Sequence, residues 1–144
     1  KQSKDVQHLT KSRDLYAEAF ETARDDYYTG INAASKSVLI GEPEDLERAA
    51  ELAARVQKIV GTEAQAGDYW KTATVAEVFL IQKDYEKAGR IYQSAVSMAL
   101  AETGSHKSTW EQACHLMNNL QPTAEQRASI RKPFEHLPDC GRAT

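Results

Sequence analysis

Glycine and proline are scarce in this sequence, and no segment alternates apolar and polar residues as a β-strand does. The 144 residues include 7 glycines and 4 prolines, which lie mainly between periodic segments. Apolar residues instead recur at steps of three and four, the pattern of amphipathic helices. The sequence therefore excludes a sheet protein and predicts an all-α chain.

Long apolar runs and an excess of basic residues are also missing. The longest apolar stretches are short, such as VFLI at 78–81, whereas a membrane-spanning helix needs about 20 apolar residues. Lys and Arg total 18, Asp and Glu total 21, and the formal net charge is −3. Binding to nucleic acids or to anionic membranes usually brings a basic surplus. We therefore expect neither a nucleic-acid partner nor a membrane partner.

Cysteine is nearly absent, since Cys114 and Cys140 are the only two. Two thiols this far apart do not make the disulfide framework of a small secreted protein, and they fit a reducing cytosol. We therefore expect a cytoplasmic protein. The chain begins at Lys1 without a methionine, so we also expect residues 1–144 to be a single domain from a longer protein.

Helix start and stop signals divide the chain into seven predicted helices. Asp25 or Asp26 can cap the second helix and Asp68 the fourth, and Gly41 and Gly61 are natural helix ends. The apolar stripe weakens at 11–13, which leaves room for a break, and residues 138–144 are expected to be frayed or to belong to a boundary. The predicted helices cover residues 3–24, 27–40, 43–60, 69–82, 85–103, 108–120 and 123–132.

An internal repeat is visible in this helical pattern. The tripeptide DYY at 26–28 recurs 42 residues later as DYW at 68–70, and the segment 84–95 has the spacing of the second helix of a tetratricopeptide repeat. A third, degenerate unit begins near Trp110, with Ala128 at its small-residue position. The repeat predicts a tetratricopeptide-like, right-handed superhelical stack of about three helical hairpins. An ordinary helical bundle is the alternative.

Three aromatic residues occupy matching places in the predicted units, namely Tyr28, Trp70 and Trp110. In tetratricopeptide folds this place faces the concave groove, where Tyr and Trp could grip a peptide. Ser35 and Glu77 follow seven residues after Tyr28 and Trp70 and would share the groove. Burial between stacked hairpins is the alternative for each aromatic side chain.

Gly30 and Asn32 stand out because neither residue favours a helix interior. One interpretation is a polar contact from Asn32 to a ligand or partner, with Gly30 allowing a close approach. The other is structural: Gly30 lets a neighbouring helix pack, and Asn32 caps or bridges helices.

The stretch DYYTGINAA at 26–34, followed by LIG at 39–41, resembles one family. It is similar to the TRAF-binding domain of the apoptosis-signal-regulating MAP kinase kinase kinases, and more closely to the bacterial relatives of that domain. DYW at 68–70 and DYEKA at 84–88 extend the resemblance. The resemblance implies a tetratricopeptide-like regulatory domain that docks signalling partners and has no catalysis of its own. No kinase motif is present, so kinase activity is not implied.

Patterns of catalytic or metal-binding residues are not found. The histidines His8, His106, His115 and His136 have no zinc-type spacing, and there is no phosphate-binding loop or nucleophile elbow. We expect no catalytic residue, no metal and no cofactor. Each histidine is interpreted as a lone residue, on the surface or half-buried.

These observations predict a non-catalytic protein-interaction or regulatory scaffold module. It would dock a protein or peptide partner, or another domain of its parent chain. A ligand-sensing helical domain that binds a small molecule or nucleotide and regulates an attached effector is the alternative, and an enzyme with a site built from separated residues is a third class. The predicted partner-binding residues are Tyr28, Asn32, Ser35, Trp70, Glu77 and Trp110.

Overall fold

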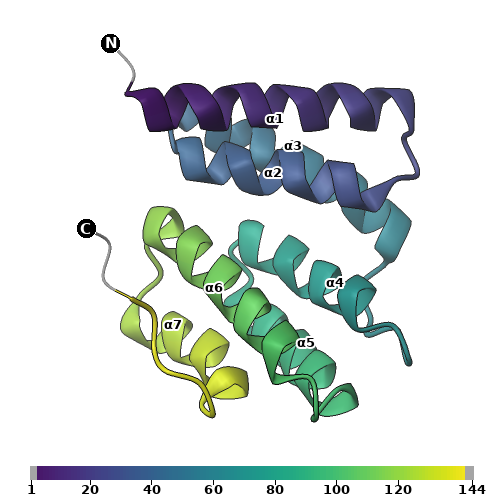
Figure 1. Cartoon of the computed structure of the whole chain (residues 1–144), viewed down its shortest axis with the longest axis vertical. Coiled ribbons are helices and arrows are strands. Elements are labelled where there is room, and N and C mark those ends of the chain that lie inside the picture. The colour runs from purple at the N-terminus through teal and green to yellow at the C-terminus, as the bar shows by residue number, and fades with distance from the viewer. Residues whose placement is uncertain (1–2, 142–144) are drawn as a thin grey trace. The chain divides into compact units, whose positions relative to one another are not determined.

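The computed structural model of the chain describes residues 3–141 and is helical throughout. Within these residues there are seven α-helices, one 3₁₀ turn and no strand (Figure 1), so the predicted all-α class is confirmed. No helix in this range is long and apolar enough to cross a membrane. The elements are α1 (Lys4–Thr22), α2 (Tyr27–Ile40), α3 (Pro43–Val60), α4 (Tyr69–Ile81), α5 (Tyr85–Met98), α6 (Thr103–Leu120), α7 (Ala124–Arg131) and η1 (Lys132–Phe134).

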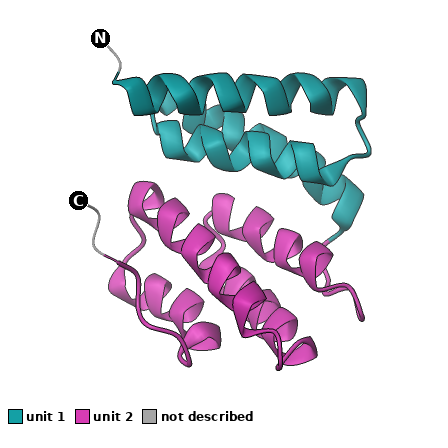
Figure 2. Cartoon of the chain, in the orientation of Figure 1, with its two compact units in different colours: residues 1–61 teal, residues 62–144 magenta. Residues whose placement is uncertain are grey.

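The helices form two compact units, residues 1–61 and residues 62–144 (Figure 2). In the first unit, α2 packs against both α1 and α3. In the second unit, α5 packs against α4, α7 and η1. The predicted hairpins α2–α3 and α4–α5 are therefore both present, each inside one unit.

Side chains at the predicted caps fix several helix ends. The Asp26 carboxylate accepts the N–H of Tyr28 at 3.1 Å, and the Asp68 carboxylate accepts that of Lys71 at 3.0 Å. Gly41, at the end of α2, has a φ of 82°, a left-handed conformation that glycine adopts without strain. These capping residues confirm the predicted starts of α2 and α4 and the predicted end of α2.

Helix α6 begins earlier than the sequence analysis predicted. The predicted helix start at residue 108 is wrong, because α6 starts at Thr103, and α5 ends at Met98 rather than near 103. The early start has a physical reason: His106 and Thr109 are buried, and a helix starting at 108 would leave His106 outside it.

Two helical glycines allow neighbouring helices to approach closely. A Cβ atom on Gly30 would lie 2.6 Å from Cγ2 of Val56 and 2.9 Å from Cζ of Phe20, so α2 meets both α1 and α3 here. A Cβ atom on Gly89, in α5, would collide with the backbone oxygen of Ser129 in α7. Gly30 therefore has the structural role that the sequence analysis gave as one of its two interpretations.

The third predicted repeat unit differs from its expected form. Ala128, the predicted small packing residue, is exposed, whereas the next residue, Ser129, faces α5 at Gly89. Helix α7 therefore packs on α5, and its contact with α6 is much smaller.

Helix α1 is continuous through the weak part of its apolar stripe, because Arg13 turns inward there. Its guanidinium group donates to Asp45 in α3 at 2.9 Å and to the Ser37 hydroxyl in α2 at 3.3 Å. Burial lowers the pKa of Arg13, but hydrogen bonds to Asp45 and Asp14 outweigh burial and leave the pKa above its ordinary value. Arg13 is thus a charged link between all three helices of the first unit.

Candidate functional site

One face of α2 carries an exposed aromatic residue followed by polar residues at helical spacing. Tyr28 is 59% exposed, and its ring meets that of Tyr16, in α1, edge to face at a centroid distance of 6.1 Å. The ammonium group of Lys36 lies 6.0 Å from the Tyr16 ring. A hydrogen bond with Tyr28 raises the pKa of Tyr16. Tyr16, Tyr28 and Lys36 therefore form an accessible cluster, which we call the tyrosine patch.

Asn32 and Ser35, the other predicted residues of α2, make hydrogen bonds within their own helix. The Asn32 amide donates to the carbonyl oxygen of Tyr28 at 2.8 Å, and the Ser35 hydroxyl donates to the carbonyl oxygen of Asn32 at 3.3 Å. Asn32 is half-buried beside the patch, whereas Ser35 is buried. Asn32 can therefore contribute to a surface, and Ser35 contributes almost none.

A second exposed aromatic residue lies at the matching place on α4. Trp70 is 54% exposed, and its ring meets that of Tyr69 edge to face at 5.0 Å. Thr74, one turn further along, donates its hydroxyl to the carbonyl oxygen of Trp70 at 2.9 Å. Glu77 is half-buried one turn beyond that. Trp70, Thr74 and Glu77 share one face of α4, which we call the tryptophan face.

Trp110 does not share the environment of Tyr28 and Trp70. It is the eighth residue of α6 rather than the second residue of its helix, and only 3% of it is exposed. Its ring stacks on Phe134 at 5.3 Å, and its Nε1 donates to the carbonyl oxygen of Pro138 at 3.0 Å. The three aromatic residues therefore do not occupy matching places, and Trp110 is buried, as the alternative interpretation had it.

Two histidines that are distant in the sequence meet in the second unit. Nδ1 of His106 lies 3.0 Å from Nε2 of His136, within hydrogen-bonding distance, and His106 is buried beside Tyr69. The Tyr69 hydroxyl and the Thr109 hydroxyl are 2.8 Å apart, and burial raises the pKa of Tyr69. The interpretation of every histidine as a lone residue is thus wrong for this pair. The segments that carry His106 and His136 meet because the residues after η1 fold back to the start of α6.

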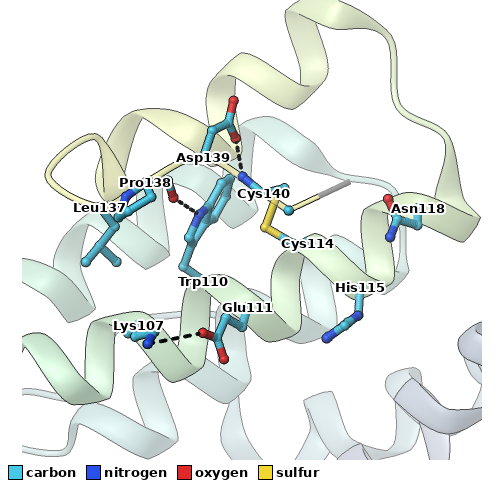
Figure 3. Close-up of a pocket in the computed structure, with 11 residues that line it drawn as sticks. Lys107, Trp110, Glu111, Cys114, His115, Asn118, Leu137, Pro138, Asp139 and Cys140 are labelled. Carbon is cyan, nitrogen blue, oxygen red and sulfur yellow. Dashed lines mark hydrogen bonds and ion pairs between the residues drawn. A yellow bond between two sulfur atoms is a disulfide. The ribbon is translucent and has the colours of Figure 1, made fainter. Parts of the chain in front are cut away.

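A pocket of about 490 Å³ lies along α6 in the same unit (Figure 3). One wall is a face of α6 that includes Trp110, Cys114 and His115, and the other wall is the segment 137–141. Lys107 and Glu111 form an ion pair of 3.9 Å at its edge, so the lining carries both signs of charge. The lining of the pocket is therefore of mixed polarity.

The two cysteines meet at this pocket as a disulfide, which corrects the interpretation of Cys114 and Cys140 as two separate thiols. Cys114 belongs to α6, Cys140 follows η1, and their Cα atoms are 5.7 Å apart (Figure 3). Helix α7 and η1 turn the chain back toward α6, which brings the two residues together. Sequence separation alone could not show this return.

The segment 137–141 is tied down and not frayed, which corrects the expectation for this part of the C-terminus. Arg127 donates to the Asp139 carboxylate at 2.5 Å, and Arg131 donates to the carbonyl oxygen of Leu137 at 2.8 Å. The hydrogen bond from Arg127, followed by that from the backbone of Cys140, lowers the pKa of Asp139. Residues 142–144 lie outside the described residues.

The described side chains offer little chemistry beyond these contacts. Among residues 3–141, no group of three or more His, Cys, Asp or Glu side chains is placed to hold a metal ion. Each unit presents an exposed aromatic residue near the start of a helix, Tyr28 in the first unit and Trp70 in the second.

The pairing of α2 with α3 and of α4 with α5 places the chain in the class of helical-hairpin domains. The chain belongs to the MAP3K TRAFs-binding domain family, whose family model matches residues 1–135. Comparisons with curated proteins and with solved structures gave no match. The family resemblance seen in the sequence is therefore confirmed, and it makes this chain a member of a protein-interaction family.

Sequence reasoning missed several residues that the structure brings into view. Tyr16 and Lys36 complete the tyrosine patch, and their signal was available, because Lys36 lies two helical turns after Tyr28. The disulfide had only the weak signal of an even number of cysteines.

Proposed function

We propose that this chain is a non-catalytic regulatory scaffold module that docks a peptide, a helix or a neighbouring domain through the tyrosine patch and the tryptophan face. The observation that carries the proposal is the exposure of Tyr28 and Trp70. More than half of each side chain is open to water, although large aromatic residues are usually mostly buried. Tyr and Trp are also the residues that dominate binding energy at protein interfaces.

The polar neighbours of these aromatics suit a protein partner. Lys36 lies over Tyr16, the ring partner of Tyr28, and Asn32 bonds the carbonyl oxygen of Tyr28. On α4, the polar residues Thr74 and Glu77 follow Trp70 at helical spacing. This is the composition of an interface anchor with a polar rim. The family supports protein partners in general, and the identity of the partner is left to experiment.

The ligand-sensing alternative has less support around Gly30 and Asn32, where it was expected. Val56 and Phe20 occupy the space beside Gly30, so no ligand could approach closely there.

We further propose that the two units work as one domain and that the protein is cytoplasmic. Disulfides in the cytoplasm are usually transient and redox-sensing.

The proposal predicts that removing the exposed rings weakens binding without unfolding the chain. A photo-crosslinking amino acid at Thr74, on the tryptophan face, would first identify the partner. We then expect Trp70→Ala to weaken the affinity for that partner by about 2 kcal/mol or more, about 30-fold. Tyr28→Ala should also weaken binding, and Glu77→Lys should add a loss that depends on salt concentration.

Leu100→Ala is the matched control, because Leu100 is exposed and apolar but lies in the turn between α5 and α6. It should bind like the wild type. Undiminished binding by a folded double variant, Tyr28→Ala with Trp70→Ala, would show that neither face is the docking surface.

A further inference from the structure

The Cys114–Cys140 disulfide is open to small molecules, unlike a disulfide sealed in a core. Both cysteines line the pocket of about 490 Å³ shown in Figure 3, and both also line a second pocket of about 580 Å³. Cys140 is half-buried, whereas Cys114 is buried, so we take Cys140 as the cysteine that a reagent meets first. A reductant can therefore reach the bond while the unit remains folded.

The disulfide is also the strongest tie on the segment 137–141, which we call the strap. The other ties are the hydrogen bond from Trp110 to the Pro138 carbonyl oxygen and the arginine contacts to Leu137 and Asp139. Asp139 and Arg127 are both well exposed, and ion pairs between exposed groups contribute little, about 0 to 1 kcal/mol. Loss of the covalent bond would leave the strap with weak ties only.

The strap covers an aromatic surface. Pro138 and Cys140 lie over the edge of Trp110 in Figure 3, and Trp110 is almost completely buried. Phe134 stacks on the Trp110 ring, and the guanidinium groups of Arg131 and Arg127 lie 5.3 and 6.0 Å from the ring centroid. Movement of the strap would therefore expose the indole edge that bonds Pro138 while leaving the contact with Phe134 in place.

We propose that the Cys114–Cys140 disulfide is a thiol-exchange site, and that its reduction by a dithiol releases the strap and uncovers Trp110. A thiolate of the dithiol attacks Sγ of Cys140, so a mixed disulfide forms and the Cys114–Cys140 bond breaks. The electron pair passes to Sγ of Cys114, which takes a proton from water. The second thiol of the dithiol then attacks the mixed disulfide and releases Cys140. The protein gains two electrons and the dithiol becomes a disulfide.

This inference does not depend on the proposed docking surface. The strap and the disulfide belong to the second unit, and neither includes Tyr28 or Trp70. In the cytoplasm the strap would be a redox-controlled cover of Trp110. It would be closed under oxidising conditions and open under reducing ones.

The test uses dithiothreitol as the probe and Trp110 fluorescence as the readout. The sequence has two tryptophans, so Trp70→Phe leaves Trp110 as the only one. In this variant we expect dithiothreitol to shift the emission to longer wavelength and to increase quenching by acrylamide. Alkylation followed by mass spectrometry should show both cysteines reduced, and circular dichroism should show the helix content unchanged.

Cys114→Ser with Cys140→Ser, made in the Trp70→Phe background, is the matched control. Its emission should equal that of the reduced protein and should not respond to dithiothreitol. Three results would overturn the proposal: no reduction until the chain unfolds, reduction without a change in Trp110 emission, or loss of helix on reduction. Failure of the cysteines to pair under an oxidant such as diamide would also overturn it.

Discussion

Arg13 shows how one residue can contradict an apolar pattern and still belong to the core. A charged side chain in the inward stripe of α1 is stable because Asp45 and Ser37 receive its hydrogen bonds. Without these partners, burial of the guanidinium would cost several kcal/mol. The sequence marked position 13 as a weak point in the stripe, but the partners lie in two other helices and could not be identified from spacing.

Removing this guanidinium should destabilise the first unit strongly. Arg13→Met keeps much of the length of the side chain but leaves the Asp45 carboxylate, which is only 13% exposed, without its ionic partner. We expect a loss of about 3 kcal/mol in the free energy of unfolding, measured by urea denaturation.

Arg24→Met is the control for this change, since Arg24 pairs with Glu21 at the surface. Its effect should stay within about 0.5 kcal/mol. Equal effects of the two substitutions would mean that Arg13 does not link the helices.

At the scale of elements, helix ends were predicted well where a capping residue lies next to the end of the helix. The helix predicted to begin at residue 123 begins at Ala124, with a capping box formed by Thr123 and Gln126, and Asp68 caps α4. The start of α6 was mispredicted because Glu102, its N-cap residue, makes no side-chain capping bond. Tertiary burial of His106 decides that boundary instead.

The contact between α5 and α7 was also outside the reach of sequence reasoning. The alanine pattern singled out Ala128, whereas the close approach uses Gly89 and the backbone of Ser129. A glycine inside a helix indicates close packing, but it does not say which helix packs there.

Gly89→Ala tests this approach directly. The new methyl group would meet a backbone oxygen that cannot rotate away, so α7 must move off α5. We expect a loss of about 1–3 kcal/mol in the free energy of unfolding through overpacking, even though alanine favours a helix.

Gly104→Ala is the matched control, because Gly104 is also helical but has nothing within 4 Å of the added methyl group. It should leave stability unchanged or raise it by up to about 1 kcal/mol. A Gly89→Ala variant as stable as the Gly104→Ala variant would contradict the packing of α7 on α5.

For the whole molecule, the sequence was informative about class and family and less so about the site. The helical periodicity, the repeated DYY and DYW tripeptides and the GINAA string predicted an all-α member of this family. Those signals are local, so they can be interpreted without knowing the tertiary contacts. The contact between the C-terminal strap and α6 is tertiary. It brings together the two cysteines and the two histidines, and it buries Trp110.

The aromatic residues Tyr28 of α2 and Trp70 of α4 are exposed, whereas Trp110 belongs to the folded interior. Trp70 makes one edge-to-face contact with Tyr69, and such a contact contributes about 0.5–1.5 kcal/mol. Trp110 is enclosed by Phe134 and the strap, and truncating a buried tryptophan typically costs about 3–5 kcal/mol.

Urea denaturation of Trp70→Ala beside Trp110→Ala therefore tests the account most directly. We predict that Trp70→Ala lowers the free energy of unfolding by no more than about 1.5 kcal/mol, and that Trp110→Ala lowers it by about 3 kcal/mol or more. Comparable losses for the two variants would contradict the account, because they would make Trp70 part of the core and leave the tryptophan face without its exposed anchor.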